Sequence, residues 1–256
     1  SKLGKPKSNL LRINANLDSS VSQAINILAK SSLASNIGSL ASWDYGGQLK
    51  TALMLQIPLK TADGISATGN YEVLSTLQDA QISIPNSPIV VADINGAIKF
   101  STTKGFYSQA ITGQFWQQPI VARLFKKSDD QNILFSTSIK PYNLNRLVDF
   151  PWSKIVSGMI PLEGLLKIKP LSSSATDSKR QEQNLNNISP VTLTVKSQLV
   201  SNGISLPVPL GKEAGEIRKL ALKLHFDSGL ARIEGTLGDH LVSDLRFIDG
   251  RFHRGV

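Results

Sequence analysis

Apolar and polar residues alternate along most of the chain after residue 48, which is the pattern of β-strands that bury only one face. The alternation is clearest in residues 191–256, where short alternating runs are separated by turn sequences such as Asn202-Gly203 and Asp249-Gly250. The polar residues between the apolar ones indicate a second face in contact with water. The pattern predicts a mainly β protein whose antiparallel strands follow one another as a meander.

Residues 21–40 have a helical period instead. Val21, Ile25 and Leu28 recur at the spacing of one helix face, and residues 18–20 offer side-chain oxygens for an N-cap. Gly46-Gly47 ends this pattern. We expect a short amphipathic helical segment that packs against one end of a β core.

The change of period divides the chain into four parts. Residues 1–47 hold a basic N-terminal tail and the amphipathic helical segment, and residues 48–170 predict an antiparallel β lobe with a short helical insert near 142–160. Residues 171–190 are rich in Ser, Asn and Gln, which predicts a flexible polar loop. Residues 191–256 predict a C-terminal β-meander that continues the sheet.

The apolar face of these strands needs a cover, because a sheet with one apolar face must bury it against another element or a ligand. The helical segment of residues 21–40 is too short to cover every strand. Two arrangements therefore stay open. Antiparallel meander sheets face each other as a sandwich, or they roll into a groove whose apolar face is open to an apolar ligand.

The composition offers little material for catalysis. The chain has 256 residues, no cysteine and 3 histidines, which excludes disulfides, thiol nucleophiles and cysteine-ligated metals. It contains no nucleophile elbow, phosphate-binding loop or zinc-protease motif. His240 with Asp239 and Asp244 comes nearest to a metal cluster, and it lies at a predicted turn. We expect no catalytic residue, no metal site, no cofactor and no enzyme activity.

The chain is basic, with 28 Lys and Arg against 19 Asp and Glu and a formal net charge of +9. Its basic pairs, such as Lys126-Lys127 and Arg218-Lys219, are scattered over predicted loops, and aromatic residues make up only 6%. This distribution argues against nucleic acid as a partner and leaves a weak attraction to an anionic membrane surface. The chain has no apolar window of about 18 residues, so we expect no membrane-spanning helix in it. It begins with Ser1 and not with Met, so we expect a processed protein or a piece of a longer parent chain.

Two stretches resemble a known family. In residues 91–100 and 105–120 a strand pair with a central glycine is followed by a return strand, as in the recurrent unit of the AsmA-like proteins of the Gram-negative envelope. Residues 203–215, which contain Leu-Pro-Val-Pro-Leu-Gly-Lys, are similar to the YhdP branch of that family. The hairpin of residues 247–255, with Asp-Gly at its turn and a final glycine, is similar to the same branch.

The resemblance implies an internal piece of a periplasmic protein that is anchored in the inner membrane and carries phospholipid to the outer membrane along an apolar β groove. It implies phospholipid acyl chains as partners and no cofactor, and it supplies no short lipid-binding signature. The alternative is a non-catalytic β-sandwich scaffold or protein-interaction module of the cell envelope, in which the same side chains form a closed core. From alternation alone, the candidate lipid-binding residues are Leu53, Leu55, Ile57, Ile94, Ile98, Phe100, Leu193, Val195, Leu222, Leu224, Ile233 and Leu245.

Overall fold

The computed structural model describes most of the chain. The described residues are 10–31, 34–58, 70–85, 87–101, 104–147, 149–169, 191–227, 230–239, 241–248 and 251–255.

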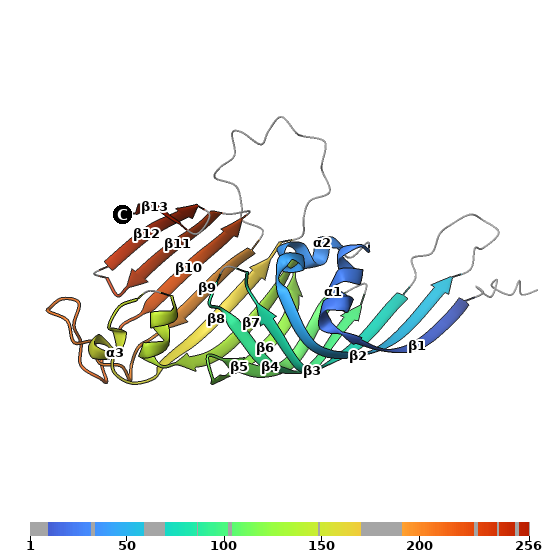
Figure 1. Ribbon diagram of the computed structural model, residues 1–256, viewed down its shortest axis with the longest axis horizontal. Coiled ribbons are helices and arrows are strands. Elements are labelled where there is room, and N and C mark those ends of the chain that lie inside the picture. The colour runs from blue at the N-terminus through green and yellow to red at the C-terminus, as the bar shows by residue number, and fades with distance from the viewer. Residues whose placement is uncertain are drawn as a thin grey trace, which may run out of the picture.

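The described strands form one antiparallel sheet of thirteen strands, in which each strand pairs with its neighbour in sequence (Figure 1). This is the meander that the alternation predicts, and the mainly β antiparallel fold class is confirmed. The strands are β1 (Leu10–Ser20), β2 (Asp44–Pro58), β3 (Asn70–Ser83), β4 (Val90–Ser101), β5 (Gly105–Phe115), β6 (Gln118–Lys127), β7 (Asp130–Ile139), β8 (Ile160–Ile168), β9 (Val191–Ser197), β10 (Leu220–Asp227), β11 (Leu230–Leu237), β12 (Leu241–Ile248) and β13 (Arg251–Gly255).

Of the two arrangements that the sequence leaves open, the sandwich is not formed by the described strands, because all of them lie in this one sheet. Strand β9 pairs with β8, from Glu163 opposite Lys196 to Ile168 opposite Val191. The strands on the two sides of residues 170–190 are therefore direct neighbours. The flexible loop expected at residues 171–190 lies outside the described residues.

The N-terminal helical prediction needs one correction. The structure has an additional strand, β1, where the sequence suggested only a tail and the start of the helical segment. The helix α1 (Val21–Ala29) follows directly, and Ser20 is its N-cap. The Ser20 side chain accepts a hydrogen bond from the Gln23 backbone N–H, and the Gln23 side chain accepts one from the Ser20 N–H, which completes a capping box.

Helix α1 packs onto one face of the sheet and forms a first core with it. Val21 on the helix lies against a cluster that includes Leu49 and Leu77, and the Ser22 hydroxyl donates to the Tyr45 backbone oxygen at 2.6 Å. The short helix α2 (Ala34–Ile37) and the 3₁₀ turn η1 (Gly38–Ser42) complete the connection to β2. The helical segment thus covers only the neighbouring N-terminal strands, as Figure 1 shows.

The strands beneath α1 are bent by β-bulges. Gly47, Asp79 and Asp93 have positive φ angles at the register shifts of β2, β3 and β4. Asn95 stabilises two of these bulges, because its Oδ1 accepts from the Asp79 backbone N–H and its Nδ2 donates to the Asp93 oxygen. A bulge increases local bend and twist, so the row of bulges curves the sheet where the helix packs.

A second core lies at the edge of the sheet where β1 ends and α1 begins, here called the lower edge. It includes Trp116, Ile139 and Leu199 and joins strand ends to the segments 140–159 and 198–219. The first segment contains the 3₁₀ helix η2 (Pro141–Arg146) and the one-turn helix α3 (Trp152–Ile155) within the region where the sequence predicts a helical insert. Among the described residues, no helix has the length and apolarity to cross a bilayer.

Candidate functional site

The strand register places apolar side chains from neighbouring strands directly opposite one another on a single face, here called the apolar face. Antiparallel partners point to the same side of a sheet, so a chain of register partners forms a row across it. The longest such row crosses seven strands from β6 to β12. Its members are Leu124, Ile133, Leu166, Leu193, Leu224, Ile233 and Leu245.

A second row runs beside the first and contains both bulky and small residues. In it Phe135 lies opposite Gly164, and a Cβ atom added at Gly164 would come within 2.0 Å of the Phe135 ring. The ring therefore covers the glycine of the next strand. The row continues through Val195, Leu222 and Gly235 to Ser243 on β12.

Ten of the twelve candidate residues lie in register rows on the apolar face, and these rows differ in how far they are buried. Four of them, Leu193, Leu224, Ile233 and Leu245, belong to the first row, and two, Val195 and Leu222, belong to the second. The remaining four lie on the N-terminal strands and are Leu53, Leu55, Ile98 and Phe100. Of these, Phe100 is buried and Ile98 packs against the core cluster beneath α1.

The other two candidates differ. Ile94 is 4% exposed and belongs to the core cluster beneath α1, so protein side chains already surround it. Ile57 is the register partner of Leu11 in the pairing of β1 and β2, and its side chain lies outside what the structure describes.

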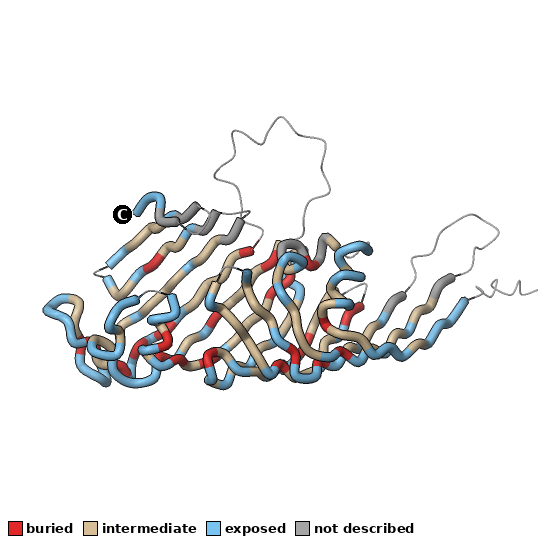
Figure 2. Tube along the Cα trace, viewed as in Figure 1, coloured by how far each residue is buried: buried red, intermediate tan, exposed pale blue. Residues whose placement is uncertain are grey.

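Burial separates the covered and uncovered parts of the apolar face. Leu49, Leu77 and Ile111 beneath α1 are buried, whereas Leu193 and Leu224 in the first row are only partly buried and belong to neither core cluster. Figure 2 shows buried residues gathered around α1 and along the lower edge, with the bodies of β9–β12 mostly intermediate. The face is therefore buried at α1, at the lower edge, and at Ile168 and Val191 on the opposite ends of β8 and β9. It is partly buried along the first row, in which Leu124 packs against the first core.

Sequence reasoning missed several members of these rows, among them Leu124, Ile133, Phe135 and Leu166. Each lies on a strand that the alternation predicts, on the same face as its predicted neighbours. The signal was present in the period of two, and the missing information was the register that brings these positions into one row.

The dimensions of the first row suit an acyl chain. Strands in a sheet are about 4.8 Å apart, so seven strands span roughly 29 Å. One leaflet of a bilayer has a hydrocarbon depth of about 15 Å, half of a ~30 Å core. An acyl chain laid across the strands would therefore contact about four of them.

The opposite face, here called the polar face, is charged and wet. On β11 and β12, Arg232 donates to both carboxylate oxygens of Asp244, at 2.9 and 2.8 Å, and lies 3.1 Å from Glu234. These hydrogen bonds from Arg232 lower the pKa of Asp244. On β10, partial burial and the nearby Lys223 lower the pKa of His225. Paired charges of this kind suit a solvated surface and leave no strongly activated group.

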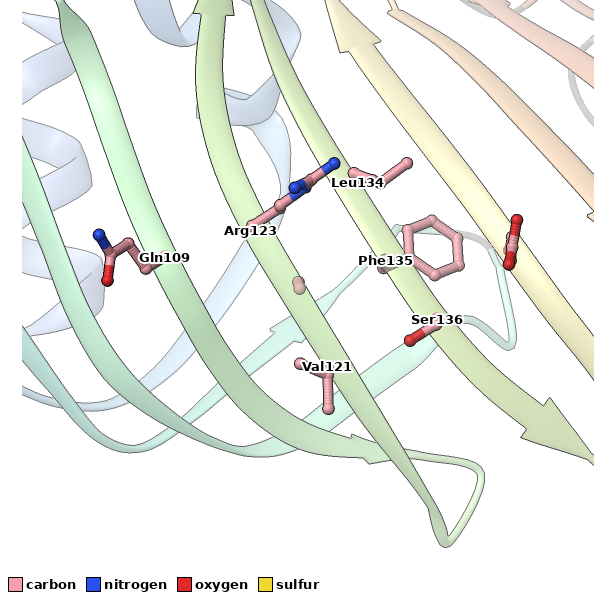
Figure 3. Close-up of a pocket in the computed structure, with 8 residues that line it drawn as sticks. Gln109, Val121, Arg123, Leu134, Phe135 and Ser136 are labelled. Carbon is pink, nitrogen blue, oxygen red and sulfur yellow. The ribbon is translucent and has the colours of Figure 1, made fainter.

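The polar face also has a shallow depression of about 320 Å³ over β5–β8 (Figure 3). Val121 and Arg123 from β6, Leu134 and Ser136 from β7, and Gln109 from β5 surround it. Its charged members are Arg123 and Glu163, and no histidine is among its lining residues to activate the Ser136 hydroxyl. Its side chains do not form a catalytic constellation.

Metal-binding chemistry has no support in the described part of the chain, where no group of three or more His, Cys, Asp or Glu residues gathers closely enough to hold an ion. In the sequence, His240 with Asp239 and Asp244 comes nearest to a metal cluster. His240 lies outside the described residues.

A family model described as YhdP protein matches residues 1–255. The chain belongs to the YhdP family. This confirms the resemblance seen in residues 91–120 and 203–255. YhdP proteins are a lipid-transport family of the Gram-negative envelope and are not known as enzymes. No curated protein and no solved structure matches the chain.

The segment of this YhdP chain that carried the resemblance, residues 203–215, has a defined structure at the lower edge. Ile204 forms β-bridges with both Val156 and Lys212. The Lys212 side chain is buried, and its ammonium donates to the backbone oxygens of Asn202 and Glu213. The segment thus pairs with the connection between α3 and β8.

Proposed function

We propose that this chain is a segment of a periplasmic YhdP protein, anchored in the inner membrane, that carries phospholipid between the inner and outer membranes along the apolar face. Acyl chains lie against the rows of apolar side chains, and headgroups stay in water. The observation that carries the proposal is the first row, from Leu124 to Leu245, which is apolar on seven consecutive strands and only partly buried.

The hydrophobic effect supplies the affinity. Each CH₂ group removed from water contributes about 0.8 kcal/mol, so an acyl chain is held strongly wherever it lies on the face. Consecutive strands offer nearly the same surface, with leucine or isoleucine at each position of the first row. Because neighbouring positions are similar in free energy, a lipid can move between them without a cofactor or a reacting group.

The two sides of one strand provide the test. Leu193 and Thr194 are adjacent on β9, both partly buried, and point to opposite faces. A photo-crosslinking phenylalanine analogue is placed at one or the other position, and the protein is irradiated in cells and extracted for mass spectrometry. We expect phospholipid adducts at position 193 and few at position 194.

Thr194 is the matched control, because the analogue there shares expression, strand and compartment with the analogue at Leu193. Equal labelling at both positions would show that the label reports general membrane proximity. Absence of lipid adducts at both, with a folded protein, would contradict lipid carriage and favour a scaffold or protein-interaction module.

A further inference from the structure

Eight of the seventeen exposed large apolar residues in the described part of the chain lie in two segments at the lower edge of the sheet. The segments 140–159 and 198–219 together form what is here called the edge lobe, which projects from the lower left of the sheet in Figure 1. Large contiguous apolar patches on a protein surface mark sites of protein or membrane contact. The exposed apolar side chains of the lobe are Tyr142, Leu147, Phe150, Met159, Val200, Leu206, Val208 and Ile217.

The most exposed of them, Val208, is held out by a braced turn. It is 92% exposed. Arg218 donates from its guanidinium to the backbone oxygens of Pro209 and Leu210, directly beside it. Asn202, which is fully buried, donates to the backbone oxygens of Ser157 and Met159 at 2.9 and 3.0 Å and so joins the two segments of the lobe just before β8. The exposure of Val208 is thus built into a structured turn.

The charges of the first segment complement anionic headgroups. Lys140, Arg146 and Lys154 are exposed there, and Asp149 is its one acidic residue. The Lys140 ammonium lies 5.8 Å from the ring of Tyr142. Aromatic side chains next to lysine and arginine are typical of the interface between water and a bilayer. The second segment has two exposed carboxylates, Glu213 and Glu216, and one exposed lysine, Lys219, so the positive charge of the lobe lies mainly on the first segment.

The lobe also adjoins the apolar face. Its inner side is the second core, in which Ile155 and Leu144 of the lobe pack near Leu162, Leu220 and Leu237 of the sheet. A surface that contacts the lobe therefore lies beside the edge of the apolar face, where the ends of β8, β10 and β11 meet it.

We propose that the edge lobe docks on the surface of a phospholipid bilayer, with Leu147, Phe150 and Val208 inserted among the headgroups. A protruding apolar turn with basic residues beside it fits a deformable lipid surface better than a rigid protein surface, which would need a matching pocket. This rests on the proposed function, because docking there brings the edge of the apolar face to the membrane from which lipid enters or leaves.

Vesicle co-sedimentation of the full 256-residue chain tests the proposal. The vesicles contain phosphatidylethanolamine with phosphatidylglycerol, or phosphatidylcholine alone. The variant Val208→Asp is compared with Val242→Asp, a matched control on the polar face of β12, where Val242 is 78% exposed. We expect V208D to weaken vesicle binding at least about ten-fold and V242D to leave it unchanged, because only the first loses an inserted side chain.

Leu147→Asp provides a second test if V208D does not fold, since Leu147 is 51% exposed and lies on the other segment. Tighter binding of the wild type to the phosphatidylglycerol vesicles is the expected effect of Lys140, Arg146 and Lys154. Equal losses in the lobe variant and in V242D, or a wild type that binds neither vesicle, would overturn the proposal. The crosslinking at Leu193 is scored separately, so lipid adducts without vesicle binding would remove the docking surface and leave lipid carriage intact.

Discussion

Two leucines distinguish an accessible apolar face from a closed core. Leu77 is 8% exposed and lies in the cluster beneath α1, whereas Leu193 is partly buried and lies in the first row, outside both core clusters. Substitution of either by alanine removes the same atoms. The difference between the two losses in the free energy of unfolding therefore reports what lies above each side chain.

The magnitudes follow from the environment of each residue. A buried leucine changed to alanine loses its transfer free energy and leaves a cavity, so Leu77→Ala should cost about 3 to 4 kcal/mol. Leu193→Ala loses only part of the transfer free energy of roughly three CH₂ groups, and water enters the space instead of a cavity forming. We expect a cost of about 1 to 2 kcal/mol.

Urea unfolding of the delipidated proteins, followed by circular dichroism, measures both values. Added phospholipid should then stabilise the wild type and L77A alike, and L193A less, because the stabilisation by a ligand grows with the logarithm of its affinity for the folded state. Equal costs for the two substitutions in the absence of lipid would refute the argument, since they would place Leu193 under a protein layer.

Three further predictions test local features. Ser20→Ala should destabilise the protein by about 1 kcal/mol in urea unfolding, since it removes the N-cap hydrogen bond of α1. Gly164→Ala should cost about 1 to 3 kcal/mol by displacing the Phe135 ring, and Phe135→Leu in the same chain should recover part of that loss. His225 has a lowered pKa in the folded state, so the unfolded chain binds its proton more readily and unfolding becomes easier as the pH falls below 6.5. His225→Gln should reduce the dependence of the free energy of unfolding on pH in this range. An unchanged dependence would contradict its assignment to His225.

Much of the sheet could be predicted from the period of two, because each strand keeps its apolar residues on one side. In β10, Leu222 and Leu224 alternate with Lys223 and His225, and the register carries that alternation to β9 and β11 unchanged. The start of α1 could be predicted for a similar reason, since the N-cap at Ser20 is a local property of the sequence.

Other features depend on information that the local pattern does not contain. Strand β1 alternates Ile13 and Leu17 with Asn14 and Asn16, and the preceding basic residues led to its assignment as a tail. Whether the strands form one sheet or two depends on the pairing of β8 with β9 across residues 170–190, a contact that alternation cannot specify. The bulges depend on positive φ angles, and Asp79 and Asp93 tolerate this conformation without requiring it.

The bulges and α1 also determine where an apolar path can continue past the helix. The cluster beneath helix α1 includes Leu49, Leu77 and Ile111. A neighbouring row of apolar residues on the same strands does not belong to this cluster. That row runs through Ala15, Leu53, Val73, Phe100 and Phe106.

The two rows can be joined by one diagonal step. Ser108, two residues after Phe106 on β5, lies opposite Leu124 on β6, so Phe106 and Leu124 are diagonal neighbours. Such positions are about 7 to 8 Å apart, within reach of an aromatic side chain. By register, the apolar path therefore extends from β1 to β12 beside the helix. Phe100 on this path is buried and Leu124 packs against the cluster beneath α1, so the path is least accessible where it passes the helix.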